Sequence, residues 1–88
     1  KSANNKATYL SEQLSKLNEF QLLYPTHGNE VFFKIKKTTY DIIIKLNIIP
    51  NLWCEINEEM LVIRFVTSFE TEQSSLDQII ARLYNEFN

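Results

Sequence analysis

The chain has 88 residues, of which 44% are hydrophobic and 23% are charged, and its formal net charge is −2. This length and composition are those of one small globular domain rather than of a disordered segment. The net negative charge argues against a nucleic-acid-binding protein, which normally carries a basic patch. No apolar run approaches the roughly 20 residues that span a bilayer. We therefore expect neither nucleic acid nor a membrane as a partner.

Two residue counts exclude whole classes of site. The single cysteine, Cys54, permits neither an internal disulfide nor a thiolate metal cage, which fits a reducing, cytoplasmic location. The single glycine, Gly28, excludes a glycine-rich phosphate loop. The chain starts at Lys1, with neither an initiator methionine nor the apolar core of a signal peptide. We expect it to be processed or to belong to a longer protein.

The first half of the chain predicts a helix, then a strand, then an element whose type stays open. Apolar residues spaced by three and four predict an amphipathic helix over residues 3–20. Alternation predicts a strand over residues 30–36. Residues 39–47, with Thr38 or Thr39 as N-cap, favour a helix, although their β-branched side chains leave a strand open. The expected buried positions are Ala7, Leu10, Leu14, Leu17 and Phe20 in the first helix, and Val31, Phe33 and Ile35 in the strand.

The second half predicts a β-hairpin and a last helix. Strands are expected at 52–56 and 60–67, and the short turn Asn57-Glu58-Glu59 requires them to pair antiparallel. Thr71 is the predicted N-cap of a helix that runs to about residue 87. The order α-β-α-β-β-α predicts an α+β fold in one domain, residues 1–88. In this two-layer sandwich, helices cover one face of a mostly antiparallel sheet of three to four strands. The buried stripe expected in the last helix is Leu76, Ile79, Ile80, Leu83, Tyr84 and Phe87.

Both faces of the predicted strand 60–67 are largely apolar. A sheet with helices on one side only should be polar on its other side. We therefore expect a second copy of this chain or another domain to cover the second face, the alternative being partial cover by loops. One face holds Leu61, Ile63 and Phe65, and the other holds Met60, Val62, Arg64 and Val66, with Phe32 and Trp53 expected on the same side.

Arg64 is the charged residue of this second face. Its planar guanidinium fits a carboxylate through two parallel hydrogen bonds. An arginine among valine and methionine needs an anionic partner when it is covered. That partner is either a ligand carboxylate or one of the chain's 11 acidic residues in a structural ion pair. Spacing alone slightly favours the ion pair.

Other chemically suggestive residues have simpler interpretations. His27 precedes Gly28 in a polar loop, without a second metal ligand nearby, so we interpret it as a loop residue rather than a ligand or a base. Cys54 is interpreted as a buried structural thiol rather than a nucleophile. Glu58 and Glu59 are interpreted as solvated turn charges rather than an acid–base pair. The remaining basic cluster, Lys34, Lys36 and Lys37, is interpreted as a solvated strand edge.

The segment Ile63-Arg64-Phe65-Val66-Thr67-Ser68-Phe69-Glu70-Thr71 resembles a known family. It is similar to the C-terminal end of low-specificity L-threonine aldolases and of the wider β-eliminating lyase group of fold-type I pyridoxal-phosphate enzymes. Tyr24-Pro25 and then Asn29-Glu30-Val31-Phe32-Phe33 resemble the family's proline loop and the strand after it. Trp53 stands where these proteins often have a tryptophan. The likeness covers almost the whole chain in order, but Gln73-Ser74-Ser75 and residues 36–51 depart from it.

The resemblance implies the C-terminal small domain of a pyridoxal-phosphate-dependent lyase that cleaves a β-hydroxy-α-amino acid to glycine and an aldehyde. Arg64 matches the family's substrate-binding arginine, which holds the substrate α-carboxylate and has no role in proton transfer. The cofactor is expected on a large domain outside these residues, so no catalytic, cofactor-binding or metal-binding residue is assigned here. The implied partners are that large domain, the amino-acid substrate and further copies in a homo-oligomer, and the isolated chain should be inactive. The alternative is a free-standing α+β regulatory or protein-interaction module.

Overall fold

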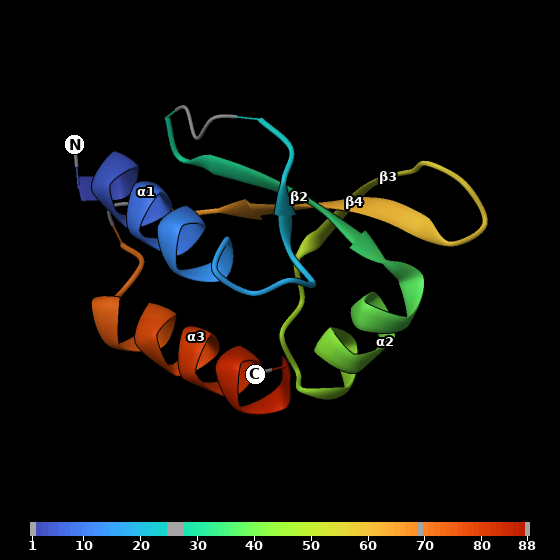
Figure 1. Ribbon diagram of the computed structural model, residues 1–88. Helices are drawn as coiled ribbons and strands as arrows, with labels where there is room; N and C mark the ends of the chain where they lie inside the picture. The colour runs from blue at the N-terminus through green and yellow to red at the C-terminus, as the bar shows by residue number, and fades with distance from the viewer. Residues whose placement is uncertain (1, 25–27, 69, 88) are drawn as a thin grey trace.

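The computed structural model describes residues 2–24, 28–68 and 70–87. The described residues form three helices and one open four-stranded antiparallel sheet, with the strand order β1-β2-β4-β3. All three helices lie on one side of the sheet, as Figure 1 shows. The predicted α+β fold is therefore confirmed. The elements are α1 (Ser2–Leu14), β1 (Gln21–Leu22), β2 (Glu30–Lys36), α2 (Lys37–Lys45), β3 (Asn51–Glu55), β4 (Met60–Val66) and α3 (Gln73–Phe87).

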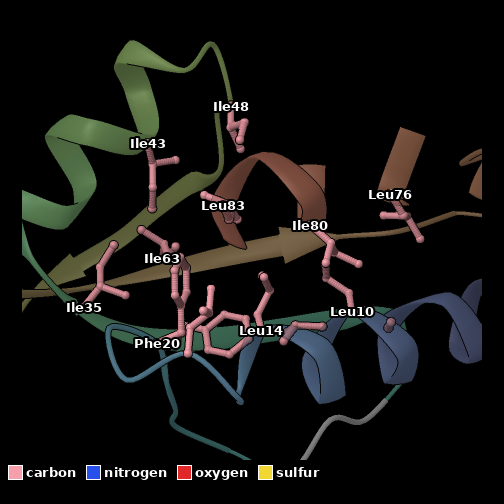
Figure 2. Packing of buried hydrophobic residues seen from close by; sticks show 14 of the residues in the cluster. Leu10, Leu14, Phe20, Ile35, Ile43, Ile48, Ile63, Leu76, Ile80 and Leu83 are labelled. Atoms are coloured by element: carbon pink, nitrogen blue, oxygen red, sulfur yellow. The ribbon is translucent and has the colours of Figure 1, made fainter. Parts of the chain in front are cut away.

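The hydrophobic core fills the space between the helices and one face of the sheet. In Figure 2, Leu10 and Leu14 of α1 and Ile80 and Leu83 of α3 meet near Ile63 of β4. Every second residue of β2 faces this core and is fully buried, as alternation along a strand requires. The predicted buried stripes are confirmed, although Ile79, Tyr84 and Phe87 pack against the core while only partly buried.

Polar contacts at the rim join α1 to α3. The Tyr9 hydroxyl donates a hydrogen bond of 2.8 Å to Asp77 Oδ1. That hydrogen bond raises the pKa of Tyr9 above its ordinary value, because it stabilises the protonated phenol. The Tyr84 hydroxyl also donates to the main-chain oxygen of Gln13. These contacts hold α1, near the start of the sequence, beside α3, near its end.

The first helix is shorter than predicted. It ends at Leu14, whereas periodicity carried it to about residue 20. The Ser15 hydroxyl donates to the main-chain oxygen of Ser11, a local contact typical of serine near helix ends. Turns then bring the amide of Leu17 to Leu14 O and the amide of Phe20 to Leu17 O. This spacing of three keeps both side chains on the buried side, so the stripe was right and the helix end was wrong.

The segment between the two long strands is a helix, α2. It starts at Lys37 directly after β2, and Lys36 occupies the N-cap position without a side-chain capping bond. The prediction that Thr38 or Thr39 caps this helix is therefore wrong, and Thr39 is buried instead. Strand β1 was not predicted, because a two-residue strand leaves no periodic signal.

The N-cap predicted for the last helix is also wrong. Helix α3 begins at Gln73, two residues after Thr71. The Thr71 hydroxyl accepts a 2.9 Å hydrogen bond from the amide of Ser68, and the Thr71 amide donates to Ser68 O at 3.0 Å. Thr71 therefore closes a turn between β4 and α3 rather than capping the helix.

Candidate functional site

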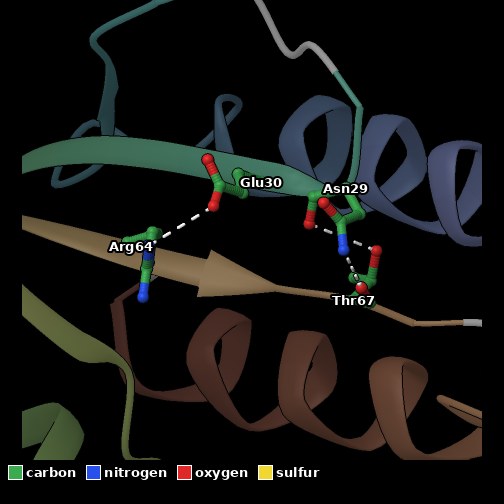
Figure 3. A network of polar contacts seen from close by, with 4 residues as sticks. All are labelled: Asn29, Glu30, Arg64 and Thr67. Atoms are coloured by element: carbon green, nitrogen blue, oxygen red, sulfur yellow. Dashed lines mark hydrogen bonds and ion pairs between the residues drawn. The ribbon is translucent and has the colours of Figure 1, made fainter.

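The two sequence segments that carry the family resemblance lie side by side as β2 and β4. Phe32 is the cross-strand partner of Arg64. Beyond the pair, Asn29 Nδ2 donates to Thr67 O at 2.8 Å and the Thr67 amide donates to Asn29 O at 2.9 Å, as Figure 3 shows. Thr67 is 2% exposed, so these hydrogen bonds satisfy buried main-chain groups. They fix the register that places Arg64 on the sheet.

Arg64 lies on the face of the sheet that no helix covers. Its Nη1 is 3.3 Å from Glu30 Oε2, and the two side chains are 26% and 42% exposed. Its Cζ lies 4.9 Å from the centre of the Trp53 ring, a cation–π distance. Its Nε is buried and has no hydrogen-bond partner among the described residues. The structural ion pair is thus present, but the pair uses one guanidinium nitrogen and leaves the buried Nε without a partner.

A β-bulge turns Trp53 onto this face. The register of β3 against β4 passes from Leu52 opposite Ile63 to Cys54 opposite Val62, so Trp53 is an extra residue. The Trp53 and Phe32 rings meet edge-on, with centroids 5.2 Å apart, which confirms that they share a side.

The ring of Tyr24 also joins this side of the sheet. Its centroid lies 5.5 Å from that of Phe32. We call Tyr24, Phe32 and Trp53 the aromatic cluster. Tyr24 and Trp53 are 53% and 52% exposed, so the cluster and Arg64 form an apolar surface around one cation.

A groove of about 420 Å³ lies beside Arg64, between the end of β4, the segment 47–51 and one side of α3. We call it the α3 groove. Among its lining residues are two arginines, Arg64 and Arg82, but no lysine and no acidic residue. Pyridoxal phosphate forms an imine with a lysine amine, so the residues of this groove do not fit that cofactor.

The prediction that Cys54 is a buried thiol is wrong, because its side chain is exposed. Strand β3 is an edge strand, and each of its residues is exposed because only β4 flanks it. Pairing with Val62 places Cys54 on the open face, beside the aromatic cluster.

The turn between β3 and β4 is confirmed. Asn57 Oδ1 accepts hydrogen bonds from the amides of Glu59 and Met60, which leaves Glu58 and Glu59 exposed. Of the basic cluster, Lys37 pairs with Glu55 at 3.5 Å.

His27 lies outside the described residues. Within the described part of the chain, no group of three histidine, cysteine or acidic side chains is placed to hold a metal ion. No helix there has the length and apolar character needed to cross a membrane.

Sequence reasoning missed two components of this region. Glu30 shares strand parity with Phe32, so alternation could have placed it on the face of Arg64. Arg82 lies four residues from Gln78 on α3, but nothing in the sequence brings α3 next to segment 47–51. That neighbourhood arises only from tertiary packing.

Comparison with known proteins gives a match in structure but none in sequence. No protein-family model and no curated protein matches the chain. A solved structure of threonine aldolase from Leishmania major matches with a TM-score of 0.86 over 99% of this chain, at 17% sequence identity. The chain spans 25% of the length of that protein and corresponds to its C-terminal portion. At this identity the match establishes a shared fold.

Proposed function

We propose that this chain is the C-terminal small domain of a pyridoxal-phosphate-dependent lyase of the threonine-aldolase type. Its contribution to the reaction is to bind and orient the α-carboxylate of a β-hydroxy-α-amino acid through Arg64. The observation that carries the proposal is the place of Arg64, on the uncovered sheet face with a buried Nε that lacks a partner. The shared fold supports the assignment.

The surroundings of Arg64 suit a carboxylate site. The Trp53 ring restricts the guanidinium on one side, and Glu30 holds a single nitrogen at 3.3 Å. An incoming carboxylate that bonds to two of the guanidinium nitrogens would form the bidentate arrangement that guanidinium favours. Anchoring the substrate at this end would orient the bond to be cleaved, a geometric contribution rather than proton transfer.

The exposed aromatic cluster supports a covering domain. Large apolar patches on a protein surface commonly mark interfaces, and Val66 of β4, at 48% exposure, extends this one. The chain matches 25% of the related structure's length, so the remainder of a comparable protein would supply the cover. That large domain would also supply the lysine and phosphate site for pyridoxal phosphate, which takes up electrons released at the substrate Cα. Homo-oligomeric assembly belongs to the same proposal.

Steady-state kinetics of the full-length protein test the role of Arg64. Arg64→Lys should raise the KM for a β-hydroxy-α-amino acid about tenfold or more, because lysine cannot form the bidentate contact. The cofactor absorbance should stay unchanged, since cofactor binding does not involve this chain. Lys16→Gln, which alters an exposed lysine, is the control and should behave as wild type. An unaltered KM in Arg64→Lys and Arg64→Gln would remove the carboxylate role.

The same preparation separates the lyase from a free-standing interaction module. A lyase should show imine absorbance with pyridoxal phosphate and release glycine from substrate. A full-length protein that shows neither would support the module, in which the Arg64–Glu30 contact is only a structural ion pair.

A further inference from the structure

The α3 groove has a polar wall built from one side of α3. Ser75, Gln78, Ile79 and Arg82 line it, and their spacing of three, four and seven residues places them on one side of the helix. Ile79 also packs against the core, which fixes this side relative to the sheet. Ser75, Gln78 and Arg82 are exposed and supply a hydroxyl, an amide and a cation along the groove.

The facing wall is segment 47–51, which begins in the turn after α2 and ends at the start of β3. Asn47 has a φ of 64°, in the left-handed region, and reverses the chain just after α2. Ile48 is 4% exposed, and its amide donates to Ile43 O at 3.2 Å. Ile49 points out of this anchored turn, is 80% exposed and lines the groove. Because it is so exposed, the Ile49 side chain presents an apolar surface to the groove that a ligand can contact.

The floor includes an unpaired strand edge. β3 begins at Asn51, opposite Arg64, so β4 runs past the start of its neighbour. Main-chain groups of successive strand residues point to opposite sides, and the Thr67 amide donates towards Asn29 beside β2. The main-chain groups of Val66 therefore point to the β3 side. There, among the residues that the structure describes, they make no main-chain hydrogen bond to segment 47–51.

The charge of the groove contrasts with that of the chain. The net charge of the sequence is −2, yet both of its arginines line this groove and no acidic residue does. Within the described ranges, Arg82 takes part in no ion pair, unlike Arg64 with Glu30. A cleft lined by one sign of charge attracts ions of the opposite sign.

We propose that the α3 groove binds a small carboxylic acid with a short apolar chain at Arg82, rather than at Arg64, which also lines the groove and is the proposed substrate position. Arg82 and the amide of Val66 donate to the carboxylate, and Ile49 and Ile79 contact the apolar chain. A cavity of about 420 Å³ suits a ligand of this size. The site does not depend on the lyase assignment, because it uses Arg82 and the helix side of the sheet edge.

Amide NMR spectra of the 88-residue chain, titrated at constant ionic strength, test this site. Sodium isovalerate should shift the amides of Val66 and Gln78 saturably, with a dissociation constant on the order of 1 mM. Arg82→Gln should weaken this binding about tenfold through loss of a charge-assisted hydrogen bond. Lys16→Gln, a matched removal of an exposed cation, should bind as wild type.

Three outcomes would overturn the proposal. Binding of neutral isovaleramide as tight as that of isovalerate would show that the groove does not recognise the negative charge. Equally tight binding of inorganic phosphate would show that it does not recognise the apolar chain. Shifts that vanish in Arg64→Gln but persist in Arg82→Gln would place the acid on the open face. In the full-length enzyme, a normal KM for amino acid in Arg82→Gln separates the two sites, so failure at one leaves the other intact.

Discussion

The two faces of the sheet contain similar residues but have different surroundings. On the helix side of β4, Ile63 is fully buried. On the other side, the next residue, Arg64, lies against Trp53, and Val66 is 48% exposed. Val62 is on the same open face but is only 2% exposed. Its cross-strand neighbours, Lys34 of β2 and Cys54 of β3, flank it on both sides. Both faces are therefore apolar in composition, but helices cover only one of them.

The largest expected effect compares one aliphatic residue from each face of β4. Ile63→Ala should lower the free energy of unfolding by about 3 kcal/mol, because it leaves a cavity in the core. Val66→Ala should change it by less than about 0.5 kcal/mol, because the side chain is already half exposed. Urea unfolding of the 88-residue chain measures both. If Ile63→Ala does not fold, Ile63→Val should still cost about 1 kcal/mol. Equal losses at the two positions would break the distinction between the faces.

A smaller effect concerns whether a covering domain closes the open face. Cys54 is exposed in this chain and sits beside the aromatic cluster. In the isolated chain its alkylation should proceed as fast as in the urea-unfolded chain. In the full-length protein the rate should fall on the order of tenfold, because burial restricts access to the thiolate. Mass spectrometry of the Cys54 peptide follows each reaction, and equal rates in both proteins would argue against a domain seated there.

The smallest effect lies in the helix layer that covers the other face. The hydrogen bond to Asp77 raises the pKa of Tyr9, so the folded state holds the phenol proton more tightly than the unfolded chain. The stabilisation is present in full below the unfolded pKa of about 10 and is lost as pH rises through the higher folded value. The stability difference between wild type and Tyr9→Phe should therefore be small and constant from pH 7 to about 9 and shrink above it. Chemical unfolding across this range measures it, and a difference that grows with pH would contradict the contact.

The sequence predicts the parts of this fold that depend on periodicity. Alternation located both long strands, and spacing by three and four found the stripe from Leu10 to Phe20 even though the helix stops at Leu14. The predicted ends of elements were wrong where a serine or threonine hydroxyl forms a hydrogen bond with a different partner, as Thr71 does with Ser68. Propensity rules describe average preferences, whereas these bonds depend on the particular turn.

The candidate site divides in the same way. Alternation placed Arg64 on the second face with Phe32 and Trp53. The burial predicted for Cys54 failed because no periodic pattern reports that a strand lies at the edge of a sheet. Arg82 was not singled out, because its neighbours in the groove, residues 47–51, are distant from it in the sequence.

The pairing of β2 with β4 has a consequence for how the domain folds. The two strands are central in the sheet, yet Asn29 and Thr67 are separated by 38 positions, and Tyr9 and Asp77 by 68. Such non-local contacts must close long loops before they gain any interaction energy, which slows folding. The β3–β4 hairpin is the local unit that can form early. Helix α1 should reach its final packing only after α3 has been synthesised, so a nascent chain would present the inner side of α1 to chaperones until then.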